Sequence, residues 1–223
     1  MPAITADDGV KLHYEEAGTG APIVFVHEFA GDWRSWEPQM RYFSRRYRCI
    51  SYSARGYLPS DVPKGAENYS QDHWREDVRA VIDALGLDAP HVVGLSMGAF
   101  ATLHFGMKYC ALGAPARARS LTLAGVGSGA HPAAYAKFQD DSKALSETIR
   151  RDGMAKVAAT YGHGPARVQF LNKDPRGFAE FAKQFAEHSA EGSASTMAGY
   201  QARRPCLYDL TGEISRIDVP TLV

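Results

Sequence analysis

Cysteine is scarce in this chain of 223 residues, and its three cysteines, Cys49, Cys110 and Cys206, are far apart. They form neither a metal-binding spacing nor an even set for disulfide bonds, so we expect a reducing, cytoplasmic location. The sequence also lacks an apolar run long enough to cross a bilayer, which predicts no membrane partner. Asp7 and Asp8 stand near the start without an apolar h-region, so we expect no signal peptide.

Excess charge of one sign is absent as well. Lysine and arginine together number 25, aspartate and glutamate number 25, and the formal net charge is zero. Basic residues gather only in pairs such as Arg45-Arg46 and Arg150-Arg151, so nucleic acid is not expected as a partner. The apolar share of 45% is enough for a large single core, or for a core with a lid.

The most informative stretch is residues 91–107. A short apolar run at Val92 predicts a buried strand, and the small and apolar residues 99–107 predict a buried helix. Between them lies Gly94-Leu95-Ser96-Met97-Gly98, a G-x-S-x-G motif in the strand–turn–helix context that gives the motif meaning. The two glycines lack Cβ atoms, so the helix can pack close to the strand.

Such a sharp turn holds Ser96 out at the carboxyl edge of a sheet. The N–H of Met97, at the start of the helix, has no partner within the helix and can face an anion. We therefore predict Ser96 as a catalytic nucleophile and Met97 as half of an oxyanion site.

A second motif follows the apolar run 23–26 and reads His27-Glu28-Phe29. Together with the serine turn, it resembles the α/β-hydrolase family, many members of which carry His-Gly and then a small or aromatic residue here. The resemblance implies that the N–H of Phe29 completes the oxyanion hole with that of Met97. Glu28 departs from the family, where glycine is usual, and its carboxylate could distort the loop or repel the oxyanion.

His27 and Glu28 are assigned a supporting role, in which they hydrogen-bond the loop. A zinc-protease reading would need His-Glu-x-x-His, and the fifth position here is Gly31. We therefore predict no metal. No cofactor is predicted either, because the loop 125–129 lacks the third glycine of a dinucleotide motif and is expected to be a flexible exit from the sheet.

The fold class that this pattern predicts is α/β, with a mostly parallel, doubly wound sheet of the α/β-hydrolase type. Residues 3–16 are expected to form a hairpin that turns at Asp8-Gly9. Further strands are expected at 23–26, 48–52 and 121–124, and helices at 33–47 and 69–85. The loop Ser53–Asp61 resembles the family's Asp-x-Arg-Gly-x-Gly-x-Ser loop, which implies a bracing role for Arg55.

Three segments follow from the change of composition along the chain. Residues 1–129 are predicted to form the α/β-hydrolase core. Residues 130–212 are rich in alanine and helical in pattern, which predicts a helical lid. Residues 213–223 resemble the entry into the next core strand, and the C-terminal strands of the family are absent from this sequence.

A serine nucleophile needs a base and an orienting carboxylate, which in this fold follow later in the chain. Neither is found here, and none of the histidines present stands where the fold places the base. We expect the chain to be a fragment, a cleaved product or part of a longer sequence, or else to be completed by a second polypeptide that supplies the missing strands. These 223 residues alone are expected to have little esterase activity.

The predicted function is that of a serine hydrolase acting on a small ester or another activated carbonyl. The resemblance argues against haloalkane dehalogenases and epoxide hydrolases, which use Asp at this position. Esterases, C–C hydrolases, lactonases and cofactor-free haloperoxidases are not separated. The alternative is a non-catalytic homologue that binds a small ligand in the lidded pocket.

Overall fold

A computed structural model describes residues 1–127 and 129–223, so Ser128 of the predicted exit loop lies outside the described residues. Seven strands form one sheet in the order β1-β2-β4-β3-β5-β6-β7. Their bounds are β1 Ala3–Thr5, β2 Lys11–Ala17, β3 Ala21–Val26, β4 Tyr47–Tyr52, β5 His91–Leu95, β6 Ser120–Ala124 and β7 Thr221–Leu222. The β1–β2 and β2–β4 pairs are antiparallel and the others are parallel, which confirms the predicted mostly parallel sheet.

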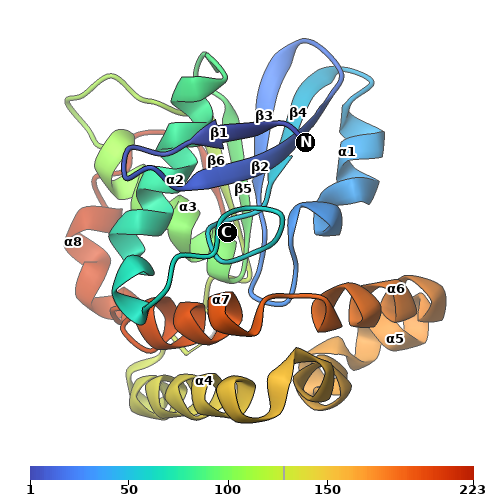
Figure 1. The fold of residues 1–223 in the computed structure, drawn as a ribbon. Coiled ribbons are helices and arrows are strands. Elements are labelled where there is room, and N and C mark those ends of the chain that lie inside the picture. The colour runs from blue at the N-terminus through green and yellow to red at the C-terminus, as the bar shows by residue number, and fades with distance from the viewer. Residues whose placement is uncertain (128) are drawn as a thin grey trace.

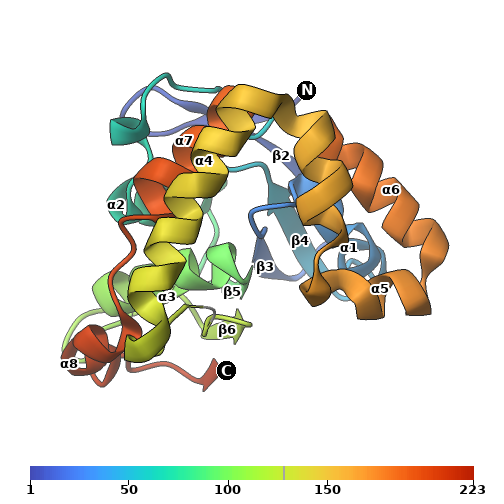
Figure 2. The same ribbon diagram turned by 90° about the horizontal axis from the view of Figure 1, so that it is seen from below.

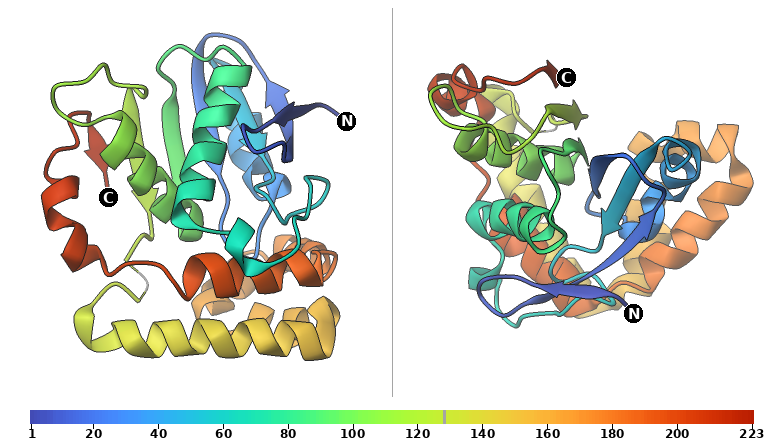
Figure 3. Two further views of the ribbon diagram at one scale, coloured as in Figure 1. Left: turned by 60° about the vertical axis from the view of Figure 1, so that its left-hand side comes forward. Right: turned by 90° about the horizontal axis from the view of Figure 1, so that it is seen from above.

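The centre of the sheet is β3, which pairs with β4 through Val24 and Ile50 and with β5 through Val24 and Val92. All three side chains are fully buried. Helices α2 (Gln71–Ala84) and α3 (Met97–Tyr109) cover one face of the sheet, and α1 (Glu37–Phe43) lies on the other (Figures 1 and 3). Continuous apolar strands form here because both of their faces are covered.

The helix predicted over 33–47 is wrong in its extent. The structure has a 3₁₀ turn, η1 Trp33–Trp36, followed by α1, and Tyr47 already belongs to β4. Asp32 caps the turn and exchanges hydrogen bonds with Ser35, so the turn starts as a separate unit. In contrast, Ser70 caps α2 as predicted, accepting a hydrogen bond from the N–H of His73.

The chain between β6 and β7 is helical and contains α4 Pro132–Thr160, α5 Val168–Lys173, α6 Pro175–Ala186, α7 Ala190–Ser195 and α8 Thr211–Ile214. Between them lie three 3₁₀ turns, η3 Tyr161–His163, η4 Pro165–Arg167 and η6 Leu207–Leu210, and one π-helix, η5 Thr196–Gln201. A non-helical residue, Gly153 with φ of 77°, divides α4. Helices α4 to α7 form a layer across the end of the sheet at which the parallel strands finish (Figure 2). The predicted boundary at residue 212 falls inside α8. None of the described helices combines the length and apolar character needed to cross a membrane.

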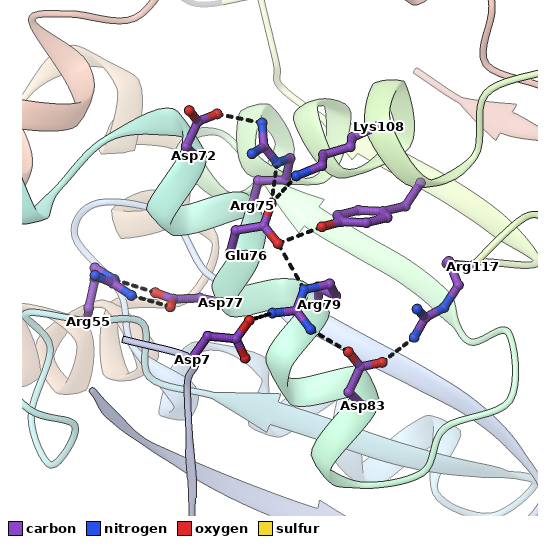
Figure 4. Close-up of polar contacts among 11 residues, drawn as sticks. Asp7, Arg55, Asp72, Arg75, Glu76, Asp77, Arg79, Asp83, Lys108 and Arg117 are labelled. Atoms are coloured by element: carbon purple, nitrogen blue, oxygen red, sulfur yellow. Dashed lines mark hydrogen bonds and ion pairs between the residues drawn. The ribbon is translucent and has the colours of Figure 1, made fainter. Parts of the chain in front are cut away.

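Charged side chains of α2 form a dense network on the core (Figure 4). Glu76 is its centre and accepts hydrogen bonds from side chains of α2 and α3, namely Arg75, Arg79, Lys108 and Tyr109. The next residue of α2, Asp77, is fully buried and accepts two hydrogen bonds of 2.6 and 2.7 Å from Arg55. These contacts fix the loop after β4 to α2, in agreement with the bracing role predicted for Arg55.

Candidate active site

Ser96 occupies the turn between β5 and α3, at the carboxyl edge of the sheet. Its backbone has φ of 52° and ψ of −109°, a region that costs a residue with a Cβ on the order of 1–3 kcal/mol. The turn is held in place because the Ser96 N–H donates to the carbonyl of Ala124 at the end of β6, at 2.7 Å. The Ser96 side chain is partly exposed, and no side chain of residues 1–127 or 129–223 is hydrogen-bonded to its hydroxyl.

The flanking glycines let three chain segments meet at this turn. A Cβ at Gly94 would lie 2.3 Å from the carbonyl oxygen of Gly98, so the strand and helix could not approach as they do. A Cβ at Gly98 would lie 2.3 Å from the carbonyl oxygen of Val26 and 2.6 Å from that of His27. The second contact brings the start of α3 against the end of β3, where the His27-Glu28-Phe29 loop begins.

Two backbone donors near this junction are free of partners in the described part of the chain. Met97 is the first residue of α3, and its N–H makes no hydrogen bond there, while its carbonyl accepts one from the Tyr200 hydroxyl at 3.2 Å. The N–H of Phe29 likewise makes none, although the Phe29 side chain is buried. Their joint action on an oxyanion remains a prediction.

His27 braces the loop. Its Nε2 accepts a hydrogen bond from the N–H of Ala54 at 3.0 Å, which leaves the ring proton on Nδ1, and Nδ1–H donates to the carbonyl of Glu28 at 2.7 Å. Burial lowers the pKa of His27 to about 4, so the ring is neutral at pH 7. Because both ring nitrogens are already engaged, His27 has no nitrogen left to take a proton from Ser96.

Glu28 does not disrupt the loop. Its side chain lies over Gly31, where a Cβ would come within 2.6 Å of Glu28 Oε1. The other oxygen, Oε2, is buried and has no hydrogen-bond partner among the described residues. Burial raises the pKa of Glu28, while the nearby Arg167 and His188 oppose that rise. The carboxyl group is thus a buried polar group with unused hydrogen-bonding capacity.

A buried pair that the sequence did not reveal lies next to this loop. The Nε2 atom of His188, which follows α6, is 3.4 Å from Oδ2 of Asp32. Burial by itself would raise the pKa of Asp32, but contacts with His188 and Arg34 outweigh it and lower that pKa well below its usual range. The Asp-x-x-Ser cap was a possible signal for Asp32. Nothing in the sequence pattern links His188 to a loop more than 150 residues earlier.

Beside the serine turn lies a cavity of about 660 Å³ between α6 and the turn η1. Its walls include Leu95, which precedes Ser96, together with Glu28 and Arg167. The volume suits a small organic molecule. Among the described residues, no group of three His, Cys, Asp or Glu side chains is placed to hold a metal ion.

None of the eight histidines is hydrogen-bonded to Ser96 within residues 1–127 and 129–223. Several of them have other contacts: His13 with Pro2, His73 with Ser70, His91 with Ser120 and His131 as a cap of α4. The His104 ring packs at a tilt against Phe100, with ring centres 5.1 Å apart, and burial lowers its pKa to about 4. The general base of a serine mechanism is therefore not identified by these contacts.

The chain matches one family model and is similar in sequence to several known proteins. The model of the family described as "alpha/beta hydrolase fold" matches residues 21–205. The 3-oxoadipate enol-lactonase 1 of Acinetobacter baylyi is 28% identical over 222 residues, which are 99% of this chain and 76% of that protein. Epoxide hydrolase 1 of Caenorhabditis elegans is 37% identical over 102 residues, 45% of this chain but only 25% of that protein.

Solved structures show the same fold at low sequence identity. The enol-lactonase from Burkholderia xenovorans LB400 superposes with a TM-score of 0.78 at 21% identity, covering 99% of this chain and 79% of that one. A thermophilic esterase from Thermogutta terrifontis superposes with a TM-score of 0.80 at 24% identity, covering 99% and 77%. This chain thus spans about three quarters of the length of these structural relatives.

Proposed function

On the premise that this chain belongs to the alpha/beta hydrolase fold family, we propose that it carries the nucleophile and oxyanion site of a serine hydrolase. The reaction is acyl transfer from a small ester, lactone or other activated carbonyl to water. The observation that carries the proposal is the strained turn at Ser96, whose φ is 52°, beside the N–H groups of Met97 and Phe29, which make no hydrogen bond with the residues that the structure describes. Strain of this kind is kept where surrounding contacts over-determine it, and it gathers at active sites.

In this mechanism the Ser96 hydroxyl attacks the carbonyl carbon, and the carbonyl oxygen takes up negative charge. The N–H groups of Met97 and Phe29 donate to that oxygen, which is how such donors lower the barrier. Losing one donor of this type typically costs about 2.7–4 kcal/mol of transition-state stabilisation. The helical layer α4 to α7 acts as the lid, because it covers the carboxyl ends of the strands and the cavity beside them.

The proton of Ser96 needs an acceptor, and we propose that the histidine and its carboxylate come from polypeptide outside these 223 residues. They would belong either to the same protein or to a second chain that completes the sheet. Support comes from the contacts of the histidines, none of which is with Ser96 in the described part of the chain. His188 and Asp32 form a buried imidazole–carboxylate pair, but Tyr57 and Phe185 pack edge-on against the His188 ring.

The test uses a fluorophosphonate probe, with turnover of a p-nitrophenyl ester as a second measurement. We expect labelling at Ser96 in the protein that contains the base, and loss of both signals in Ser96→Ala. Ser215→Ala, at an exposed serine, is the matched control and should keep both. The 223 residues alone should give little turnover, on the order of the 10³–10⁴-fold over water that remains when a triad member is missing. Robust turnover by these residues that Ser96→Ala removes would contradict the external base.

The second candidate is a protein that binds a small ligand without turning it over. Two observations favour it: Glu28 replaces the family's glycine beside Phe29, and no base among residues 1–127 and 129–223 is hydrogen-bonded to Ser96. Absence of probe labelling in the complete protein, together with retained binding of small carbonyl compounds, would select this candidate.

A further inference from the structure

Most charged side chains around the cavity of about 660 Å³ already have a partner. Asp174 caps the first turn of α6 through the N–H of Gly177. The others form ion pairs: Arg34 with Asp32 and Glu187, Arg41 with Glu37, and Glu180 with Arg176. Within the described residues, two charged side chains of this wall, Arg167 and Glu28, have neither an ion pair nor a capping role.

The planar face of the Arg167 guanidinium packs against aromatic rings, whereas the N–H groups along its edge have no hydrogen-bond partner among the described residues. The Cζ atom of its guanidinium lies 5.1 Å from the ring centre of Tyr161 and 5.2 Å from that of Phe181. Contacts with ring faces orient a guanidinium while leaving its edge N–H groups available. In the part of the chain that the structure describes, none of those groups makes a hydrogen bond, although the residue is half-buried. The arrangement presents an oriented fork of donors.

The oriented cation is close to the candidate active site. Tyr161, which contacts Arg167, also packs edge-on against Phe29, with ring centres 5.8 Å apart. Leu95, the neighbour of Ser96, lines the same cavity. For one ligand to contact both groups, its reacting carbonyl must lie at Ser96 and the rest of the molecule must extend past Leu95 into the cavity that Arg167 lines.

We propose that Arg167 binds the carboxylate of a monoanionic substrate, an ester or lactone that carries one free carboxylic acid. A guanidinium fork matches the two oxygens of a carboxylate. One unpaired cation compensates one negative charge, and the neighbouring Glu28 carboxyl disfavours a dianion such as phosphate. This inference deepens the proposed function, since it names the substrate class of the same site.

Binding tests the inference without relying on turnover. In the intact protein carrying Ser96→Ala, NMR titrations would compare monomethyl esters of the dicarboxylic acids from succinate to suberate with the matching dimethyl esters. We expect the monoester of the best-fitting length to bind about 10- to 100-fold more tightly than its diester, as for a hydrogen-bonded charge pair. Arg167→Gln should remove that preference, and Arg167→Lys, which keeps the charge without the fork, should reduce it.

The matched control is Arg176→Gln, which removes an arginine from α6 whose side chain is 91% exposed. It should leave the preference intact. Equal binding of monoester and diester, no effect of Arg167→Gln, or equal or tighter binding of inorganic phosphate would overturn the inference. A carboxylate preference in a protein that never reacts with the fluorophosphonate probe would support Arg167 as the recognition site and reject the hydrolase proposal instead.

Discussion

On helix α2 each charged side chain has a partner of opposite sign, whereas the cavity beside Ser96 contains Arg167 and Glu28 with no ion pair in the described residues (Figure 4 shows the α2 network). Both regions combine acids, bases and aromatic rings at partly buried positions. They differ in whether the charged side chains form ion pairs within the protein. On α2 the network joins two helices and the N-terminal hairpin, while in the cavity the unsatisfied groups face space.

The difference separates charges that hold the fold from charges available to a ligand. A buried polar group without a partner lowers the stability of the fold. Its presence therefore indicates that a bound ligand supplies the missing hydrogen bonds when the protein functions. The same reasoning applies to the backbone, where the strained turn at Ser96 lies beside two N–H donors that have no partner in the described part of the chain. We therefore expect mutations on α2 to change mainly stability, and mutations around the cavity to change mainly chemistry and binding.

The largest expected effect is at Ser96, where chemistry and stability should move in opposite directions. Ser96→Gly should abolish fluorophosphonate labelling and raise the free energy of unfolding by about 1 kcal/mol, because glycine adopts positive φ without strain. Ser96→Ala is the matched control: it also loses labelling but keeps the Cβ and its strain. Urea unfolding of both variants measures the difference. Equal stability would mean that the turn is not strained.

Asp77→Asn should be the most destabilising change in the α2 region. It removes the charge that compensates the buried Arg55, and breaking a buried pair typically costs about 3–5 kcal/mol. The control on the same helix is Asp72→Asn, whose side chain is 74% exposed and whose pair with Arg75 should contribute at most about 1 kcal/mol. Chemical denaturation measures both. A small loss at Asp77 would show that Asp8, which also pairs with Arg55 at 2.7 Å, is enough to compensate the guanidinium.

Glu76→Gln should cost less, about 1–2 kcal/mol, because several charged hydrogen bonds are weakened but none is deeply buried. Glu37→Gln offers a comparison at a single surface pair, with a Glu37 side chain 54% exposed and an expected effect of about 0.5 kcal/mol or less. Measuring both at low and high salt sharpens the comparison, since salt screens exposed pairs more strongly. If the two variants lost the same free energy of unfolding, the network around Glu76 would contribute no more than a single surface ion pair.

The smallest effect concerns Glu28 and depends on pH. Its folded-state pKa is raised above the ordinary 4.5 by burial, so ionisation is harder in the folded than in the unfolded chain. Stability is then fully present below pH 4.5 and falls as pH rises through the folded-state pKa. The groups around Glu28 that modify this are Arg167, His188 and Asp32.

Glu28→Gln should remove that loss, so the variant gains stability over the wild type as pH increases from about 4.5. Urea unfolding at a series of pH values measures the gain. The control is Glu180→Gln, which lines the same cavity but is 63% exposed and paired with Arg176. A pH-independent difference between Glu28→Gln and wild type would contradict a raised pKa.

Most of the sheet could be predicted because its signals are local. The run Ile23–Val26 and the hairpin at Asp8-Gly9 both specify strands through composition over a few residues. The helix predicted over 33–47 failed because apolar periodicity does not reveal a cap, and Asp32 starts a separate 3₁₀ turn. The extent of an element thus depends on side-chain hydrogen bonds that periodicity does not capture.

The residues of the candidate site also differ in whether local sequence signals predict them. Ser96, Met97 and Phe29 were predicted from motifs that each span only a few residues, and the structure brings the two motifs together at Gly98. Arg167 and His188 stand in no recognisable motif, and the groups beside which the fold places them, Glu28 and Asp32, lie more than 100 residues earlier in the sequence.

The sequence by itself determined the turn at Ser96 and the order of strands and helices, since glycine spacing and apolar runs act through neighbouring residues. Only the tertiary structure decided which charges are satisfied. Whether Arg55 meets Asp77, or Arg167 is left facing a cavity, depends on how distant segments pack. The physical reason is that charge compensation acts between atoms a few ångströms apart in space, at any separation along the chain.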